Sequence, residues 1–455
     1  MPIQSKNPAT GEVIRTFEEI TDSELEIKLQ KAATAFESWK RVSFEERAKL
    51  FMKLSDYLIE NKEELGKLST IEMGKTVATA AGGLERSALN CQFYAENAEK
   101  FLQNEYVDTK ATESYIKFDP LGVILAVMPW NFPFWQVYRG AAPALMAGNV
   151  MILKHASNVP QCAIAIEESF LKAGFSEGIF QNVLLGSARV EKVVRDSRIA
   201  AITLTGSEKA GGEVAKVAGA EIKKCVLELG GSDPFIVMPD ADLGLAVSLA
   251  TDSRMSGNSG QACNAAKRFI VHESVAKQFT EDLVASFKNL VVGNPEDTTT
   301  QVGPLATEQI LSDLEKQVVQ SVGLGAKIEV GGKRWGDKGY YYEPTVLSNA
   351  KKGMPVFDEE VFGPVAAIIS FKDEVEALKL ANDTPYGLAA TIITNDLKKA
   401  KLLTAQIDAG NVFINALVRS DPRLPFGAIK KSGYGRELGS YGIKEFTNLK
   451  TVWIK

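Results

Sequence analysis

Histidine and closely spaced cysteine are nearly missing from this 455-residue sequence. It contains two histidines, His155 and His272, and four cysteines, none of which form a CxxC pair. This composition argues against a histidine-rich metal site, a zinc or disulfide framework, and a Ser-His or Cys-His hydrolase. We therefore expect no metal centre, and proton chemistry that depends on carboxylates, lysines or thiols.

Long apolar runs and an excess of positive charge are also lacking. Apolar runs end near ten residues, whereas a membrane-spanning helix needs about 20. Residues 1–7 do not contain the apolar core of a signal peptide. The 52 Lys and Arg against 57 Asp and Glu give a formal net charge of −5, which disfavours a nucleic-acid partner. The sequence thus predicts a cytoplasmic protein that binds neither membranes nor nucleic acid.

In the middle of the chain, short apolar runs alternate with amphipathic helical stretches. Runs such as 122–128 and 150–153 are typical of strands in a parallel sheet that helices cover on both faces. The alternation restarts after Gly230-Gly231, which predicts two α/β domains that meet there. The segments 115–118 and 444–454 predict a small antiparallel β appendage used in subunit pairing.

One cysteine differs from the others in its surroundings. Cys91, Cys162 and Cys225 lie in helical or strand stretches that are typical of buried small residues. Cys263 follows Gly260–Ala262, where glycine allows close backbone approach and a helix can begin. Backbone N–H groups at a helix start lower the pKa of a thiol and can hold an oxyanion. Cys263 is therefore the candidate nucleophile.

Two further polar residues follow apolar strands. Glu228 is either a charged strand end or a general base whose pKa is raised by its apolar neighbours. Asn131, between Pro129 and Pro133, is either a turn residue or an amide donor to a developing oxyanion. Each of these signals is weak when it is taken alone.

The glycine fingerprint GxGxxG of ordinary dinucleotide sites is missing. Gly186 and the pair Gly206-Ser207 instead follow strands and precede helices, where backbone N–H groups can face a pyrophosphate. Lys154 ends an apolar strand, at the edge where ligands bind to such sheets. Plain turns and a solvated lysine would give the same pattern.

Eight motifs occur in one order over essentially the whole chain. They are Pro129–Pro133, Pro143–Asn149, Leu153-Lys154, Thr205–Ser207, Leu227–Gly231, Gly260–Cys263, Glu360–Pro364, and Pro425–Gly427 with Lys431–Glu437. In this combination the sequence strongly resembles the NAD(P)-dependent aldehyde dehydrogenase superfamily.

The resemblance implies an α/β fold with a Rossmann-like cofactor domain, a second α/β catalytic domain and a small antiparallel β oligomerisation appendage. The dinucleotide-binding domain would comprise residues 1–106 and 121–230, and the catalytic domain residues 231–431. Residues 107–120 and 432–455 would form oligomerisation and bridging segments. The resemblance also implies a homodimer or a homotetramer.

The same resemblance implies a covalent reaction. Cys263 would attack the aldehyde carbon, and the oxyanion would be held by the Asn131 amide and the Cys263 backbone N–H. Glu228 would activate the water that hydrolyses the resulting thioester to a carboxylic acid.

The implied cofactor is NADP, NAD or both. The residues implied to bind it are Trp130, Lys154, Ser157, Gly186, Gly206, Ser207, Glu360 and Phe362. Relatives that prefer NAD often carry an acid at the position of Ser157, where it binds the ribose hydroxyls. A serine does not repel a 2′-phosphate and Lys154 can pair with one, so we expect NADP to be accepted.

Within the superfamily, three stretches resemble succinate-semialdehyde dehydrogenases of the shorter bacterial type, namely 153–156, 223–237 and 265–270. This implies oxidation of succinate semialdehyde to succinate, and a cation to bind the carboxylate of this small aldehyde. Arg139 matches an arginine with that role in relatives, and Ser420 is a second candidate contact. Several relatives place another arginine where this sequence has Gly257.

Other functions stay open at this point. The substrate could be glutarate semialdehyde or a neutral aliphatic aldehyde. The presence of Glu228 counts against the CoA-acylating branch of the superfamily, which lacks an equivalent of it. The presence of Cys263 counts against a binding protein with the same fold, which would not need it. Asn264 and Ala265 follow Cys263, so we expect no redox switch with a neighbouring cysteine.

Overall fold

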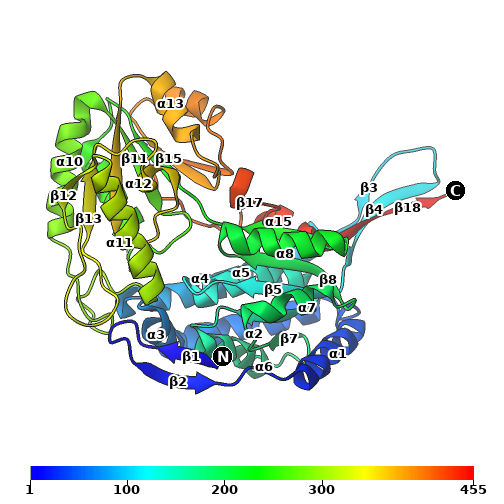
Figure 1. Cartoon of the computed structure of the whole chain (residues 1–455). Coiled ribbons are helices and arrows are strands. Elements are labelled where there is room, and N and C mark those ends of the chain that lie inside the picture. Colours follow the sequence, from blue (N-terminus) through cyan, green and yellow to red (C-terminus); the bar gives the residue numbers. More distant parts are fainter. Residues whose placement is uncertain (1, 256) are drawn as a thin grey trace.

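The computed structural model describes residues 2–255 and 257–455. Two lobes, each built around a sheet with helices packed against it, are joined side by side, and a narrow arm projects from one of them (Figure 1). The α/β class predicted from the alternation of apolar runs and helices is confirmed.

The first lobe contains a six-stranded sheet with the order β17-β9-β8-β5-β6-β7. Its strands are β5 (Val123–Met128), β6 (Val150–His155), β7 (Phe180–Asn182), β8 (Ile199–Thr205), β9 (Lys224–Glu228) and β17 (Gly433–Tyr434). Strands β5 to β9 are parallel, whereas β17 is antiparallel to β9. Because parallel strands end at one edge of a sheet, the loops after β5, β8 and β9 lie close together.

Helices from two parts of the chain surround this sheet. They are α1 (Asp22–Trp39), α2 (Phe44–Glu60), α3 (Lys62–Met73), α4 (Val77–Phe101), α5 (Pro133–Met146), α6 (Pro160–Lys172), α7 (Val190–Arg195), α8 (Glu208–Ala220) and α15 (Gly439–Glu445). Of these, α1, α5, α6, α7 and α8 contact the sheet directly. Helices α1 and α2 begin at capping boxes, Thr21 with Glu24 and Ser43 with Glu46, which satisfy backbone N–H groups at the helix starts. The N-terminal hairpin of β1 (Ile3–Lys6) and β2 (Val13–Phe17) also belongs to this lobe.

The second lobe contains a seven-stranded sheet with the order β12-β13-β14-β11-β10-β15-β16. The strands are β10 (Asp233–Val237), β11 (Ala266–His272), β12 (Lys327–Val330), β13 (Thr345–Ser348), β14 (Val365–Phe371), β15 (Ala389–Ile393) and β16 (Asn411–Ile414). The helices are α9 (Leu243–Met255), α10 (Glu273–Lys288), α11 (Glu308–Gly323), α12 (Pro355–Asp358), α13 (Glu374–Asn382) and α14 (Leu397–Thr404).

Both faces of this second sheet are buried. Ile236 and Ile270 belong to one hydrophobic cluster, while Phe235 and Phe269 belong to another. Because neighbouring residues of a strand point to opposite faces, the two clusters lie on opposite sides of the sheet. This explains why the strands are apolar throughout rather than alternating.

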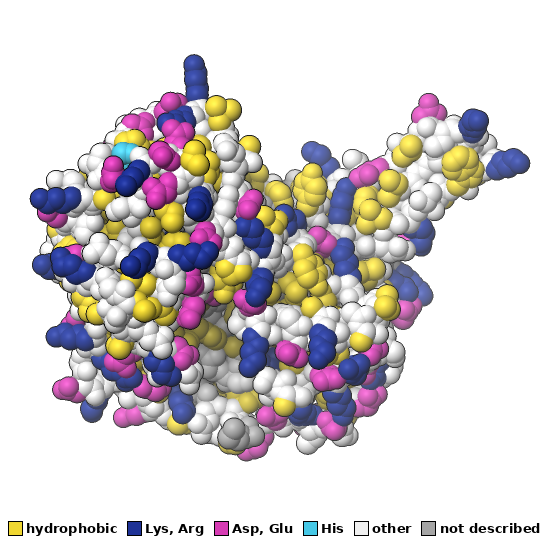
Figure 2. Space-filling view, turned by 45° about the horizontal axis from the view of Figure 1, so that its top comes forward, with side chains coloured by type: hydrophobic (Ala, Val, Ile, Leu, Met, Phe, Trp, Pro, Cys, Tyr) yellow, Lys and Arg dark blue, Asp and Glu magenta, His cyan; other side chains and the backbone are white. Residues whose placement is uncertain are grey.

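The arm is a three-stranded antiparallel sheet of β18 (Thr447–Ile454), β4 (Glu113–Pro120) and β3 (Glu105–Tyr106). It stands away from the body, and hydrophobic side chains are exposed on it, including Tyr106, Leu449 and Trp453 (Figure 2). The strand expected over 444–454 is shorter at its start, because α15 extends to Glu445.

Within residues 2–255 and 257–455, no helix is both long enough and apolar enough to cross a bilayer.

Candidate active site

A cavity of about 250 Å3 lies at the edge where β5, β8 and β9 end. The loops after these strands contribute Trp130 and Asn131, Gly206 and Ser207, and Glu228 to its lining. The second lobe contributes its remaining predicted residues, Cys263, Glu360 and Phe362. Eight of the residues predicted from scattered motifs therefore surround one space between the two lobes.

Cys263 is partly exposed to this cavity, whereas Cys91, Cys162 and Cys225 are buried. The helix start that we expected at Cys263 is not found in residues 257–265, because β11 begins directly after this loop. Left-handed backbone at Gly257, Ser259 and Gly260 keeps the segment out of a helical path. A helix N-terminus is therefore not what activates the thiol.

A buried lysine supplies positive charge beside the thiol instead. The Lys267 ammonium donates hydrogen bonds to the backbone carbonyls of Ala262 (3.0 Å) and Cys263, and lies 3.4 Å from the Glu360 carboxylate. Burial raises the pKa of Cys263 to about 11, and the positive charges of Lys267 and Arg139 oppose that rise. The sequence reasoning missed Lys267, whose signal is its position four residues after the nucleophile.

Asn131 is buried at the wall of the cavity. Its side-chain Nδ2 donates to the Gln261 carbonyl at 3.1 Å, and its Oδ1 has no partner among the described residues. Asn258 donates in turn to the backbone carbonyls of Asn131 (3.2 Å) and Gln261 (2.7 Å). These bonds hold the Asn131 amide next to the loop of Cys263, as an oxyanion donor requires.

Glu228 ends β9 and is 3 % exposed. Neither of its carboxylate oxygens has a hydrogen-bond partner among residues 2–255 and 257–455. Burial and the nearby charge of Glu437 raise its pKa, while Arg139 and Arg436 oppose the rise. A buried carboxylate with a raised pKa and free oxygens has the properties of a general base.

Arg139 is not where its predicted role would place it. Its side chain is 2 % exposed, forms an ion pair with Glu437 and donates to the Thr205 hydroxyl at 3.3 Å. Arg139 lines neither this cavity nor a neighbouring cavity of about 270 Å3, which is described below. Ser420 also lies outside both linings. The binding of a substrate carboxylate by Arg139 stays a prediction, and the ion pair with Glu437 does not favour it.

Another cavity, of about 570 Å3, continues along the edge of the first sheet. Ser157 and Gly186 line it, together with Glu19 and Thr307. Lys154, at the end of β6, is 7 % exposed, and burial lowers its pKa.

Together the two cavities fit a dinucleotide. They lie at the carboxyl edge of one parallel sheet, and α8 begins at Ser207 in the lining of the smaller cavity, so that the positive end of this helix faces the edge. Gly230 allows the Glu360 carboxylate to approach, since a Cβ there would lie 2.2 Å from Glu360 Oε2. Trp130 and Phe362 pack edge to face at 5.7 Å and form an apolar wall.

A neighbouring cavity of about 270 Å3 adjoins the Cys263 loop from the other side. Three cations that the sequence reasoning missed, Lys75, Arg86 and Arg419, line it. Lys75 and Arg86 lie at and on α4, whereas Arg419 comes from a distant segment, and the three belong to no recognisable motif.

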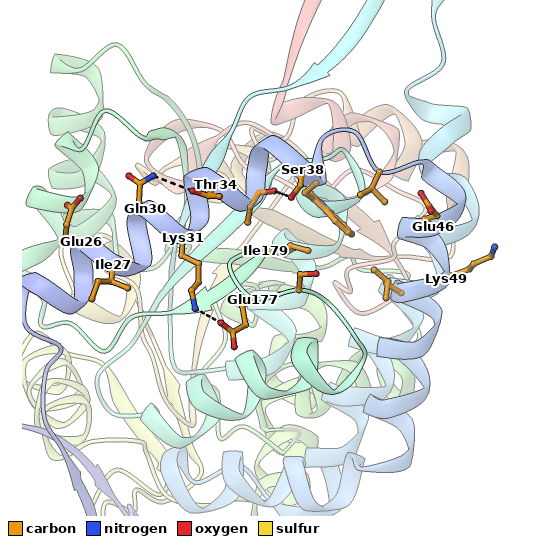
Figure 3. A pocket seen from close by; sticks show the side chains of 15 residues that line it. Glu26, Ile27, Gln30, Lys31, Thr34, Ser38, Glu46, Lys49, Glu177 and Ile179 are labelled. Atoms are coloured by element: carbon orange, nitrogen blue, oxygen red, sulfur yellow. Dashed lines mark hydrogen bonds and ion pairs between the residues drawn. The ribbon is translucent and has the colours of Figure 1, made fainter.

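A larger hollow of about 1100 Å3 lies elsewhere, on the surface formed by α1, the start of α2 and residues 176–179. Figure 3 shows Lys31 paired with Glu177 across it. None of the residues predicted for the site lines this hollow.

Comparison with known proteins places the whole chain in one family. Residues 1–452 match the model of the Aldehyde dehydrogenase family. A probable succinate-semialdehyde dehydrogenase [NADP(+)] of Synechocystis sp. is 50 % identical over 454 residues, and succinate-semialdehyde dehydrogenase [NADP(+)] 1 of Mycobacterium tuberculosis is 49 % identical over 457 residues. Each alignment covers 100 % of both chains.

Solved structures agree with this assignment. The succinic semialdehyde dehydrogenase of Streptococcus pyogenes, in complex with NADP+, is 37 % identical, with a TM-score of 0.97 over 99 % of both chains. The chain described here belongs to the aldehyde dehydrogenase family.

Proposed function

We propose that this protein oxidises succinate semialdehyde to succinate, with NADP+ as the electron acceptor and a thioester on Cys263 as the intermediate. The observation that carries the proposal is the convergence of Cys263, Asn131 and Glu228 on one cavity. The names of relatives that are about half identical over their full length support the choice of substrate and cofactor.

The first step is attack of the Cys263 sulfur on the aldehyde carbon, which forms a C–S bond and turns the carbonyl oxygen into an alkoxide. Lys267 and Arg139 favour the thiolate form that attacks. The Asn131 amide and the Cys263 backbone N–H stabilise the alkoxide, as preorganised donors do.

The proposed cofactor residues of the first lobe, together with Glu360, would hold the dinucleotide along the sheet edge. The chemistry that an oxidised nicotinamide supplies when bound is acceptance of a hydride from the former aldehyde carbon. Phe362 and Trp130 exclude water from that part of the cavity.

Glu228 serves the second half of the reaction. Its ionised carboxylate takes a proton from water, the water oxygen attacks the thioester carbon, and the C–S bond breaks to release the acid and regenerate the thiol. The unpartnered oxygens of Glu228 are free to bind this water.

A serine at position 157 is more compatible with the 2′-phosphate of NADP than an acidic residue at that position would be. Ser157 lines the cavity at the far end of the sheet edge and carries no charge that repels a 2′-phosphate. The buried Lys154 adds a positive charge to the same strand end.

We also propose that subunits pair through the arm, as a homodimer or a homotetramer, and that the protein works in the reducing cytoplasm, where a thiol such as Cys263 stays free. The exposed Leu449 and Trp453 on β18 support pairing, since an arm of three strands buries little apolar surface by itself.

The test is reduced-nicotinamide absorbance with succinate semialdehyde, glutarate semialdehyde and butanal, each with NADP+ and NAD+. We expect the highest kcat/KM with succinate semialdehyde and NADP+, and no activity in Cys263→Ala. A higher kcat/KM with glutarate semialdehyde or butanal would overturn the substrate, and full activity in Cys263→Ala would overturn the mechanism.

A further inference from the structure

The 270 Å3 cavity and the cavity of Cys263 share a wall. Two pairs of neighbouring residues mark their boundary. Ala262 lines the former cavity and Cys263 the latter, and in the same way Phe132 lines the former and Asn131 the latter. An aldehyde whose other end lies in the 270 Å3 cavity therefore has a short path to both the thiol and the amide.

Three of the four cationic side chains that line this cavity, Lys75, Arg86 and Arg419, have no counter-ion among the described residues. Lys75, two residues before α4, is 7 % exposed, and its ammonium lies 4.8 Å from the ring centre of Phe132. The Arg86 guanidinium, on α4, lies 5.4 Å from the ring centre of Trp135. Across residues 2–255 and 257–455, no carboxylate lies within 4.0 Å of Lys75, Arg86 or Arg419.

The cations also act on one another. Burial and the charge of Arg86 lower the pKa of Lys75 to about 8, and burial and the charge of Arg419 lower that of Arg86. Uncompensated buried charge is costly in a folded protein, and a bound anion removes that cost. The one acid in the lining, Asp252, is exposed and pairs with none of the three.

Two other residues of this region are excluded as anion-binding groups. Arg254 also lines the cavity, but its guanidinium donates to the backbone carbonyls of Gly363 (2.9 Å) and Ala266 (3.0 Å). Gly257 has a φ of +63°, and a Cβ there would lie 2.1 Å from Thr79 Oγ1. Since no long side chain fits at position 257, positive charge must come from elsewhere.

We propose that this cavity binds the terminal carboxylate of an oxo-acid substrate while its aldehyde carbon lies at Cys263. Lys75 and Arg86 bind the carboxylate, and the exposed Arg419 attracts it at the mouth. The inference rests on the proposed function and deepens it, because it assigns the selection of carboxylate-bearing aldehydes to residues other than Arg139.

The experiment compares succinate semialdehyde with its methyl ester in the variants Lys75→Met and Arg86→Gln. Each variant keeps most of the side-chain shape and removes the charge. We expect the KM for succinate semialdehyde to rise about ten- to hundredfold, since the loss of a hydrogen bond to a charged group weakens binding by about that factor. The kinetics with the ester are expected to change less than about twofold. Arg41→Gln, on the surface next to α2, is the charge-matched control and should behave as wild type.

A second measurement uses only the wild-type enzyme, in case a variant does not fold. Succinate should inhibit oxidation of the ester competitively, whereas succinamide should not. An unchanged KM for succinate semialdehyde in both folded variants would overturn the inference, as would equal inhibition by succinate and succinamide. If wild type does not prefer succinate semialdehyde to its ester, the proposed substrate fails instead, so the two failures are distinguishable.

Discussion

Glu228 is buried without a hydrogen-bond partner among the described residues, and its pKa is raised. Only the ionised carboxylate accepts a proton from water, so hydrolysis of the thioester should be slow at low pH and accelerate as the pH rises through this raised pKa. In Glu228→Gln we expect turnover to fall about 10²- to 10³-fold while one equivalent of reduced cofactor still forms in a burst. Stopped-flow absorbance measures both phases.

Glu213→Gln, at an exposed position on α8, is the control and should keep the wild-type turnover and pH profile. Loss of the burst in Glu228→Gln would mean that this carboxylate activates the thiol rather than the water.

Lys267 contacts both the backbone of Cys263, the proposed nucleophile, and the carboxylate of Glu360, which we propose binds the cofactor. Lys267→Met removes a positive charge beside the sulfur, so the pKa of Cys263 should rise further and less thiolate should be present at neutral pH. We expect alkylation of Cys263 by iodoacetamide to slow about tenfold, which corresponds to one pKa unit. The pH dependence of the alkylation rate is the measurement.

A structural role alone would leave that pH profile in place. An unshifted profile in Lys267→Met would therefore contradict the electrostatic role, and Lys277→Met, at an exposed position on α10, is the matched control.

Ser157 lines the cavity of about 570 Å3 along the edge of the first sheet. Ser157→Glu places a negative charge near the expected position of the 2′-phosphate, so kcat/KM with NADP+ should fall about tenfold or more relative to NAD+. Steady-state kinetics with both cofactors tests this, and an unchanged ratio would refute the proposed position of the phosphate.

Residues that follow strands could be predicted from the sequence, and residues defined by their partners could not. Asn131 and Glu228 end apolar runs, which is visible in one sequence. The neutralisation of Arg139 depends on Glu437, which lies far away along the chain. Lys75 and Arg86 likewise approach the loop of Cys263 only after α4 packs beside it.

At the scale of single elements, α6 depends on a residue from another helix. It begins after Val159, which offers no side-chain cap, and the Glu72 carboxylate of α3 instead accepts the N–H groups of Gln161 (3.0 Å) and Cys162 (2.9 Å). Glu72→Gln removes the negative charge at this helix start, so we expect a loss of about 1–3 kcal/mol of unfolding free energy. Urea unfolding measures it.

The control for this variant is Glu63→Gln, on the exposed face of α3, which should change stability by less than about 0.5 kcal/mol. Equal stability of Glu72→Gln and wild type would show that α6 does not need the external cap.

Most strands and helices follow from apolar periodicity, and the exceptions have local causes. The runs at 122–128 and 150–153 became β5 and β6 with small changes in their ends. The helix start expected at Cys263 was wrong because tertiary contacts determine the left-handed backbone of this loop. A Cβ at Gly260, for example, would lie 2.0 Å from the carbonyl oxygen of Gly363. The periodicity of apolar residues in the sequence does not reveal such a close contact between distant backbone segments.

At the scale of the whole molecule, the arm provides the surface that we propose for subunit pairing. Replacing Leu449 and Trp453 of β18 together by aspartate puts charge on an apolar face, so the oligomer should dissociate at micromolar concentration. Light scattering after size exclusion gives the mass. Leu402→Asp, an exposed apolar position on α14, should leave the mass unchanged, and an intact oligomer in the double variant would contradict pairing through the arm.

The two-lobe arrangement could be predicted because each lobe restarts the same alternation. We propose the division into 1–106 with 121–230, 231–431, and 107–120 with 432–455. One element departs from it, since β17 lies within the last segment and pairs with β9 in the first sheet. Two residues are too short a strand for sequence periodicity to reveal.

That pairing has a consequence for biosynthesis. The other five strands of the first sheet have been synthesised by the time Glu228 is added, whereas β17 is made only after the entire second lobe. Until then the backbone N–H and C=O groups at the outer edge of β9 are not paired with β17 and can pair with a strand of another polypeptide. A message truncated before codon 433 should therefore give a polypeptide that chaperones and proteases recognise as unfinished, even though it contains all three side chains proposed to be catalytic, Asn131, Glu228 and Cys263.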